Sequence, residues 1–313
     1  VGSLYHFSEV LVRAIPLMLT GLAVALAATM LLWNIGCEGQ LVWGGIAAAA
    51  VGLFAAPHLP EALVLPAVIL AGAAGGALWA LIPALLKAYL AVNEILSSLL
   101  LNYIAIIFME HLYFGPWRNP EGFGFPGTAQ IHDLARMPHW GGTRVHLGLL
   151  LALVLALLLF GALRRTPWGY RVRVIGHNPR AARYAGFRFR RHLIGVMLMS
   201  GALAGLAGMA EVSGIHFRLQ QGLAVGYGYD GIIVAWLARL NPLAVPFTAL
   251  LLGALIVGGE QLQSSLHLPS SISMVLEAVL LFGLLLSEAL ARYRLVRHPP
   301  AQPLARQGES MPS

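Results

Sequence analysis

The stretch 171-RVRVIGHNPRAARYAGF-187 lies between two long apolar runs and holds four arginines and no acid. It is the centre of a longer basic segment, 164–192, which carries nine arginines and neither Asp nor Glu. Loops rich in Arg and Lys beside membrane spans are retained on the cytoplasmic side. The stretch therefore predicts a cytoplasmic loop at 164–192, and this loop fixes the orientation of every apolar run around it.

The apolar runs dominate the composition. Of 313 residues, 58% are hydrophobic and 11% are charged, whereas about a quarter of a soluble domain is charged. About 20 apolar residues in a helix cross a bilayer, because a helix satisfies its own backbone polar groups. The sequence predicts an all-α, polytopic membrane helix bundle with about nine transmembrane helices. They are expected at about 10–32, 41–57, 62–86, 95–114, 146–163, 193–212, 221–238, 243–263 and 272–291.

If each helix crosses the membrane once, counting outward from the cytoplasmic loop assigns a side of the membrane to every connecting segment. Residues 115–145 become the one long external loop, and the chain begins outside. Nine crossings with an external start imply a missing leading helix, and thus ten in the full-length chain. The transmembrane domain is expected to span 1–291. The tail 292–313 has little apolar content, so it is predicted to be cytoplasmic and disordered.

Small residues recur inside the apolar runs, as in 71-AGAAGGALWA-80 and 200-SGALAGLAGMA-210. Gly and Ala at these spacings let helix backbones approach closely, so the helices should pack on one another. Two regions, 21–50 and 201–214 with 226–242, each combine a small-residue helix, a polar Gly-bearing break and another apolar run. Pseudo-repeat halves with broken helices are typical of a transport path.

Several functions are disfavoured by residue counts. The only lysine is Lys87, so the chain has no phosphate-loop motif and no ATPase site of its own. The net charge of +7 lies mostly between apolar runs, which does not fit a nucleic-acid-binding face. The single Cys37 cannot form an internal disulfide, and no Cys/His set has metal-ligand spacing. We expect no catalytic residue, no metal site and no cofactor.

Within the basic loop, a short helix is predicted from 179 onward. Asn can cap this helix, Pro suits its first position, the alanines give it a smooth face and Gly ends it. Such a helix fits a groove on a cytoplasmic protein. Alternatively, the arginines only retain the loop inside and bind anionic membrane lipid. The residues expected to dock are Asn178, Pro179, Ala181, Ala182, Ala185 and Gly186.

Polar side chains gather at the first helix break, where Asn34, Glu38 and Gln40 follow one another closely. Amides and freed backbone groups can offer donors and acceptors to sugar hydroxyls or to the edge of a base. The alternative is that these side chains only satisfy the break itself. Further along, Asn102 lies inside an apolar run and is a candidate for the path, whereas Asn93-Glu94 better fits a helix cap.

The second break supplies the matching group. Gly228 permits close backbone approach, and Asp230 either contacts solute or caps the helix that follows. Trp33 and Trp236 adjoin the two breaks and can stack on a base or a sugar ring, or serve only in packing. Glu211 and Glu260 also lie in apolar runs, where an ionisable group needs a partner or a water-filled cavity.

Four ordered segments carry a resemblance to a known family. They are 33-WNIGCEGQLVWGG-45, 82-IPALLKAYLAVNEILSSLLLNYIA-105, 175-IGHNPRAARYAGF-187 and 226-GYGYDGIIVAWLARLNPLAV-245. They resemble permease subunits of nucleoside and simple-sugar ABC importers, within the group that includes ribose and branched-chain amino acid permeases. The resemblance touches most of the chain from about 16 to 290. Ala84, Trp236 and Ala238 depart from the family pattern, in which Gly, Leu and Gly are expected.

The resemblance implies a permease in the plasma membrane of a prokaryote. Its partners would be a cytoplasmic ABC ATPase, a second permease subunit and an extracytoplasmic solute-binding lipoprotein, with nucleosides favoured as substrate. Two other functions stay open: an ion-coupled secondary carrier using the buried carboxylates, and an intramembrane hydrolase using Ser200 or Ser213. The hydrolase is disfavoured because no G-x-S-x-G setting is present.

Overall fold

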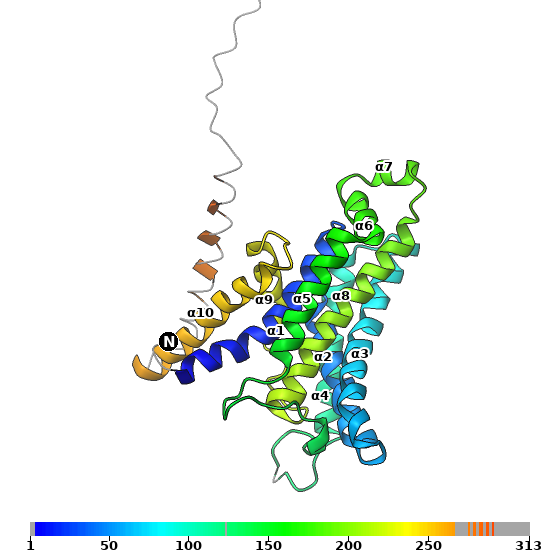
Figure 1. Cartoon of the computed structure of the whole chain (residues 1–313). Coiled ribbons are helices and arrows are strands. Elements are labelled where there is room, and N and C mark those ends of the chain that lie inside the picture. Colours follow the sequence, from blue (N-terminus) through cyan, green and yellow to red (C-terminus); the bar gives the residue numbers. More distant parts are fainter. Residues whose placement is uncertain are drawn as a thin grey trace, which may run out of the picture.

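The computed structural model describes residues 4–122 and 124–266, together with separate positions between 275 and 290. The described part is an all-helical bundle (Figure 1). Seven of its helices are long and apolar enough to cross a membrane. They are α1 (Leu4–Ala28), α2 (Cys37–Ala50, continued by η1 and η2 to His58), α3 (Glu61–Leu90), α4 (Glu94–Phe114), α5 (Gly148–Arg165), α8 (Phe189–Glu211, continued by η4 to His216) and α10 (Val245–Leu266).

These seven helices coincide, within a few residues at each end, with seven of the nine predicted ranges. The prediction at 272–291 and the predicted disordered tail at 292–313 lie outside the described residues. The predicted helix at 221–238 is shorter in the structure, where α9 (Tyr227–Leu237) has 11 residues. At 1.5 Å per residue α9 is about 16 Å long, roughly half the thickness of the hydrocarbon core. By itself, therefore, α9 cannot cross a membrane.

Close contacts between α2, α3 and α8 form the tightest part of the bundle. A Cβ at Gly205 would collide with the backbone of Gly72 and Gly76, and a Cβ at Gly208 would collide with the carbonyl of Leu41. Only glycine allows the backbones to approach this closely. The prediction that the small-residue runs pack helix on helix is confirmed.

The helix α1 runs through the middle of the bundle. It contacts α8, α9 and α10. Over an apolar stretch of 18 residues of α1, 89% is buried inside the chain. In Figure 1, α3 and α4 lie on one flank, and α9 and α10 lie on the other. A helix that is covered by protein on nearly all sides can hold polar side chains at membrane depth.

The two ends of the bundle differ. One end carries α6 (Pro167–His177) and α7 (Pro179–Tyr184), and the opposite end carries the long 115–147 segment with η3 (Asp133–Ala135) (Figure 1). That segment is tied down by backbone hydrogen bonds: Ile131 N–H donates to the Phe217 carbonyl at 2.8 Å, and Met137 N–H to the Ser213 carbonyl at 2.8 Å. The first is the α7 end of the bundle and the second is its loop end.

Sequence reasoning missed the helix α6, because 164–192 was interpreted as one basic loop. The signal is present at its start, where the Thr166 hydroxyl accepts the Gly169 N–H at 3.1 Å and Pro167 occupies the first helical position. A hydroxyl cap followed by Pro is a common helix start.

Candidate functional site at the junction of two helix breaks

The first break lies between α1 and α2, and the second lies before α9. At the first, Leu31 adopts a φ of 57°, and at the second Gly226 adopts a φ of 102°. The two breaks touch, because a Cβ at Gly228 would collide with the backbone of Glu38. Glycine is therefore required at 228 for the start of α9 to reach the start of α2.

Glu38 joins the two breaks directly. One carboxylate oxygen accepts the Gly226 N–H at 2.9 Å, and the other accepts the Gly228 N–H at 2.6 Å. Glu38 itself is buried, at 1% exposure. Both oxygens accept from N–H groups at a helix N-terminus, where the helix dipole favours negative charge. The Glu38 side chain thus satisfies the free N–H groups at the start of α9.

Asn34 and Gln40 form a reciprocal pair of amides across the first break. Each side-chain NH₂ donates to the other's oxygen, at 2.8 and 2.9 Å. The Asn34 NH₂ also donates to the Ser200 hydroxyl at 2.8 Å, and that hydroxyl donates to the Ala23 carbonyl at 2.7 Å. Ser200 is therefore a hydrogen-bonding partner of the break. Sequence reasoning considered Ser200 only as a nucleophile.

Asn102 reaches the same junction from α4. Its side-chain oxygen accepts the Gly39 N–H at 2.9 Å, and its NH₂ donates to the Ile35 carbonyl at 2.9 Å and to the Tyr229 hydroxyl at 3.1 Å. The structure thus brings together five predicted positions: Asn34, Glu38, Gln40, Asn102 and Gly228. In this conformation each polar side chain among them forms hydrogen bonds with backbone groups or with another side chain.

The two predicted aromatic residues, Trp33 and Trp236, also meet. Their ring centroids are 5.5 Å apart with an interplanar angle of 30°, so they stack on one another. They remain 45% and 36% exposed. Asp230 is half-buried on the same short helix as Trp236. Tyr229, Asp230 and Trp236 thus place polar and aromatic groups on a helix that begins inside the bundle.

A second polar group lies next to the junction and was not predicted as a site. The Arg13 guanidinium donates to the Tyr227 hydroxyl at 2.7 Å and contacts the Glu260 carboxylate at 2.7 Å. It links α1, α9 and α10. The sequence signal was Arg13 itself, a charged residue inside an apolar run, which needs a partner at that depth.

Asn93 and Glu94 behave as predicted for a helix start. The Asn93 side chain accepts the Ile95 N–H at 2.9 Å. Glu94 forms an ion pair with Lys87 at 2.7 Å, across the turn between α3 and α4. Within the described residues, no group of three His, Cys, Asp or Glu is arranged to hold a metal ion.

At the α7 end, the predicted helix start is confirmed. The Asn178 side chain accepts the N–H groups of Arg180 and Ala181 at 3.1 and 3.0 Å. Pro179 opens the helix, and Gly186 follows it with a φ of 76°. The three alanines do not form the one exposed face that the sequence had predicted. Ala182 is buried at 3% exposure, whereas Ala181 and Ala185 are exposed.

A bundle of apolar spans with two broken helices meeting at a buried polar junction defines a membrane transport protein. The family described as branched-chain amino acid transport system / permease component matches residues 6–285. The chain belongs to this family. It is a multi-pass membrane protein, the permease subunit of an ABC importer, and not an enzyme itself.

Three curated relatives support this assignment. The glucose ABC transporter permease protein TsgB13 of Haloferax volcanii is 36% identical over 94% of this chain and 79% of its own length. The guanosine ABC transporter permease protein NupP of Bacillus subtilis is 34% identical over 90% of this chain and 81% of its own. The guanosine ABC transporter permease protein NupQ of Bacillus subtilis is 29% identical over 78% of each chain.

Proposed function

We propose that this permease forms the translocation path for a nucleoside or a simple sugar. The observation that carries the proposal is the stacked and partly exposed pair of Trp33, in the first break, and Trp236, on α9, with the half-buried Asp230 on the same short helix. Sugars and nucleosides are recognised by such groups, through hydrogen bonds to hydroxyls and base edges and by stacking on ring faces. The substrate names of the relatives, glucose and guanosine, support the same class.

Within this site we propose two roles. The first role is to hold the two breaks against one another, through hydrogen bonds to the backbone and between side chains. The residues with this role are Asn34, Glu38, Gln40, Asn102 and Gly228. Trp33, Trp236 and Asp230 line the path and contact the solute. Opening the Trp33–Trp236 stack exposes two ring faces between which a planar base or a sugar ring fits.

The orientation follows from charge. We propose that the α7 end, with the arginine-rich segment 164–192, is cytoplasmic and that 115–145 is external. On this threading each of the nine predicted ranges crosses the membrane, and the two halves are pseudo-repeats around the two breaks. Because α9 is only about half the length of a span, its crossing is broken and is completed by the 217–226 segment.

The partners follow from the same orientation. We propose that a cytoplasmic ABC ATPase docks on α7, that a second permease subunit completes the path, and that a solute-binding lipoprotein delivers substrate to the external side. Two permeases of one organism, both described as guanosine permeases, support a heterodimer. The chain lies in the plasma membrane of a prokaryote, surrounded by lipid.

A physical connection exists between the docking helix and the site. The helix α6 continues directly into α7 at Asn178, and α6 packs so closely on the first break that a Cβ at Gly176 would collide with the Thr29 carbonyl. A movement of α7 driven by the ATPase is therefore passed to 29–36, which contains Trp33 and Asn34. A packed contact of this kind transmits rigid-body motion.

The test is uptake by the reconstituted transporter. We expect proteoliposomes that contain both permeases and the ATPase, supplied with the binding protein, to accumulate labelled guanosine or glucose only with internal ATP. An ATPase subunit that cannot hydrolyse ATP is the control. Uptake that continues with this ATPase and follows an ion gradient would instead establish the secondary carrier.

A further inference from the structure

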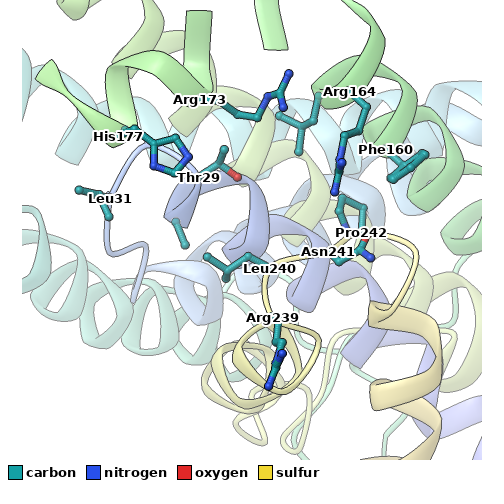
Figure 2. Close-up of a pocket in the computed structure, with 13 residues that line it drawn as sticks. Thr29, Leu31, Phe160, Arg164, Arg173, His177, Arg239, Leu240, Asn241 and Pro242 are labelled. Atoms are coloured by element: carbon teal, nitrogen blue, oxygen red, sulfur yellow. The ribbon is translucent and has the colours of Figure 1, made fainter. Parts of the chain in front are cut away.

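A pocket of about 420 Å³ opens at the α7 end, where Thr29 and Leu31 at the start of the first break contribute to its lining. Its walls come from the end of α1, the end of α5, the helix α6 and the turn between α9 and α10 (Figure 2). Segments that are distant in sequence thus surround one space, and its lining contains none of the residues proposed to contact the solute or to dock the ATPase.

The lining of this pocket is basic. Arg164, Arg173, Arg239 and His177 contribute to it, and none of its lining residues is Asp or Glu. Figure 2 shows the Arg164 side chain extending toward Asn241 and Pro242, whereas the Arg239 side chain extends away from the other two arginines. No ion pair in the described part of the chain involves these arginines. The positive charge of the pocket therefore has no counter-charge within that part of the chain.

One donor in the pocket wall is buried and unsatisfied. The Nε atom of Arg173 has no hydrogen-bond partner in the described part of the chain. A buried donor left without an acceptor costs about 1–3 kcal/mol, and more when it belongs to a charged group. An anionic acceptor in the pocket removes this cost, and guanidinium groups bind phosphate oxygens especially well.

The pocket lies at the depth of lipid headgroups. Ala28 and Arg164 belong to the last turns of the apolar spans α1 and α5, so the pocket begins where the hydrocarbon-spanning helices end. The span α5, and the span α10 that follows the lining turn 239–242, also present large apolar side chains at their surface. On α5, Leu157 is 62% exposed, and on α10, Phe247 is 74% exposed.

We propose that this pocket binds the phosphate of an anionic phospholipid, with Arg164 and Arg173 as the phosphate-binding residues and the acyl chains lying along the exposed faces of α5 and α10. The proposal rests on the cytoplasmic orientation of the α7 end, which places the pocket in the inner leaflet. A lipid fits better than a soluble phosphate because basic and apolar surfaces adjoin at one depth. The bound lipid joins α6, which continues into the docking helix, to the turn that follows α9.

The test compares two double variants of the assembled transporter. R164Q/R173Q removes one charge from the end of α5 and one from α6, and both residues line the pocket. R165Q/R171Q removes the same charges from the same two helices, at residues outside the pocket lining. Native mass spectrometry counts bound lipid in mixed micelles with phosphatidylglycerol, with phosphatidylcholine, or with phosphatidylglycerol plus inorganic phosphate.

We expect one tightly bound phosphatidylglycerol per copy of this chain, not replaced by phosphatidylcholine or displaced by millimolar phosphate. Its affinity should fall roughly thirtyfold in R164Q/R173Q, since each arginine near a membrane surface contributes on the order of fivefold, and should be unchanged in R165Q/R171Q. Displacement by inorganic phosphate would overturn the lipid assignment in favour of a soluble anion. Equal loss in both variants, or loss in neither, would overturn the site.

The same binding measurement is independent of transport. If the reconstituted complex transports neither nucleosides nor sugars while the lipid is lost only from R164Q/R173Q, the proposed substrate class fails and the lipid site stands. In the opposite case, uptake is normal but no phosphatidylglycerol binds specifically. That result leaves the transport function intact and refutes the lipid site.

Discussion

Glu38 is the single residue on which the junction depends most. It is buried and accepts hydrogen bonds from two backbone N–H groups at the start of α9. Sequence reasoning placed Glu38 at the first break and Gly228 at the second, but it could not show that they touch. A contact across 190 positions in sequence depends on how α2 and α9 pack, and no local pattern records that packing.

Replacing Glu38 by Gln tests this link. The amide keeps one acceptor oxygen but turns an NH₂ toward the second backbone N–H, so one hydrogen bond to a charged group is lost and two donors face each other. We expect a destabilisation of roughly 2–4 kcal/mol, measured as a lower midpoint of thermal unfolding in detergent. Glu121→Gln, at an exposed loop position, is the matched control. Equal midpoints for the two variants would mean that Glu38 does not join the breaks.

His146, at the loop end, predicts a pH dependence. It is fully buried, and its Nδ1 accepts the Gly148 N–H at 3.2 Å. Burial, with a smaller contribution from His139, lowers the pKa of His146 to about 4. The unfolded chain binds the proton first, near pH 6.5, so the stabilisation is complete above about pH 6.5 and is lost as the pH falls toward 4.

Between pH 7.5 and 5 we therefore expect a loss of roughly 2 kcal/mol of unfolding free energy from this residue. Thermal unfolding across that range measures it. His146→Asn retains an acceptor without a titrating ring, so it should flatten the dependence, whereas His132→Asn, at an exposed residue, should not. A wild-type profile unchanged by His146→Asn would contradict the assignment.

At the scale of elements, the contact between α2 and α8 depends on glycine. A Cβ at Gly208 would overlap the Leu41 carbonyl, whereas no atom lies within 4 Å of a Cβ at Gly195 on the same helix. Gly208→Ala should cost about 1–3 kcal/mol through overpacking. Gly195→Ala should be neutral or slightly stabilising, because Ala favours the helix. Thermal unfolding of both variants checks the pair, and a stable Gly208→Ala protein would refute the close approach.

The helix α7 is the second element to test. Because Ala182 is buried, a large side chain there would disturb the helix itself, and the exposed Ala181 and Ala185 are the better probes of docking. A181R/A185R should lower ATP-dependent uptake about tenfold, as overpacking of an interface costs about 1–3 kcal/mol. ATP hydrolysis should fall less. A129R, an exposed change at the loop end, controls for added charge, and normal uptake by A181R/A185R would exclude docking at α7.

For the whole molecule, sequence reasoning found the spans because apolar length alone defines them. Seven predicted ranges match α1, α2, α3, α4, α5, α8 and α10. It failed at α9, where an apolar stretch as long as a span is interrupted by Gly222 and Gly226 at positive φ. Composition reports apolar length but not where a helix begins, so a crossing that is only partly helical is hard to distinguish from a continuous transmembrane helix.

The candidate site was predicted in part for the same reason. Polar residues inside apolar runs are visible in the sequence, and Asn34, Glu38, Gln40 and Asn102 were found in this way. Their partners were not found: Ser200 was considered only as a nucleophile and Tyr229 was not singled out, because both join the network only through packing. The stacking of Trp33 on Trp236 likewise required the fold to bring two distant breaks together.

The central claim is that the solute path runs along the face of α9 that carries Trp236, and labelling of Trp236→Cys tests it most directly. The only native cysteine, Cys37, is buried at 0% exposure, so it should add little background. In the reconstituted Trp236→Cys transporter we expect a charged, membrane-impermeant thiol reagent to label position 236, and saturating substrate to slow this labelling. Leu157→Cys, on the surface of α5, should stay unlabelled in lipid. Absence of labelling at position 236, or labelling unaffected by any nucleoside or sugar, would contradict the account.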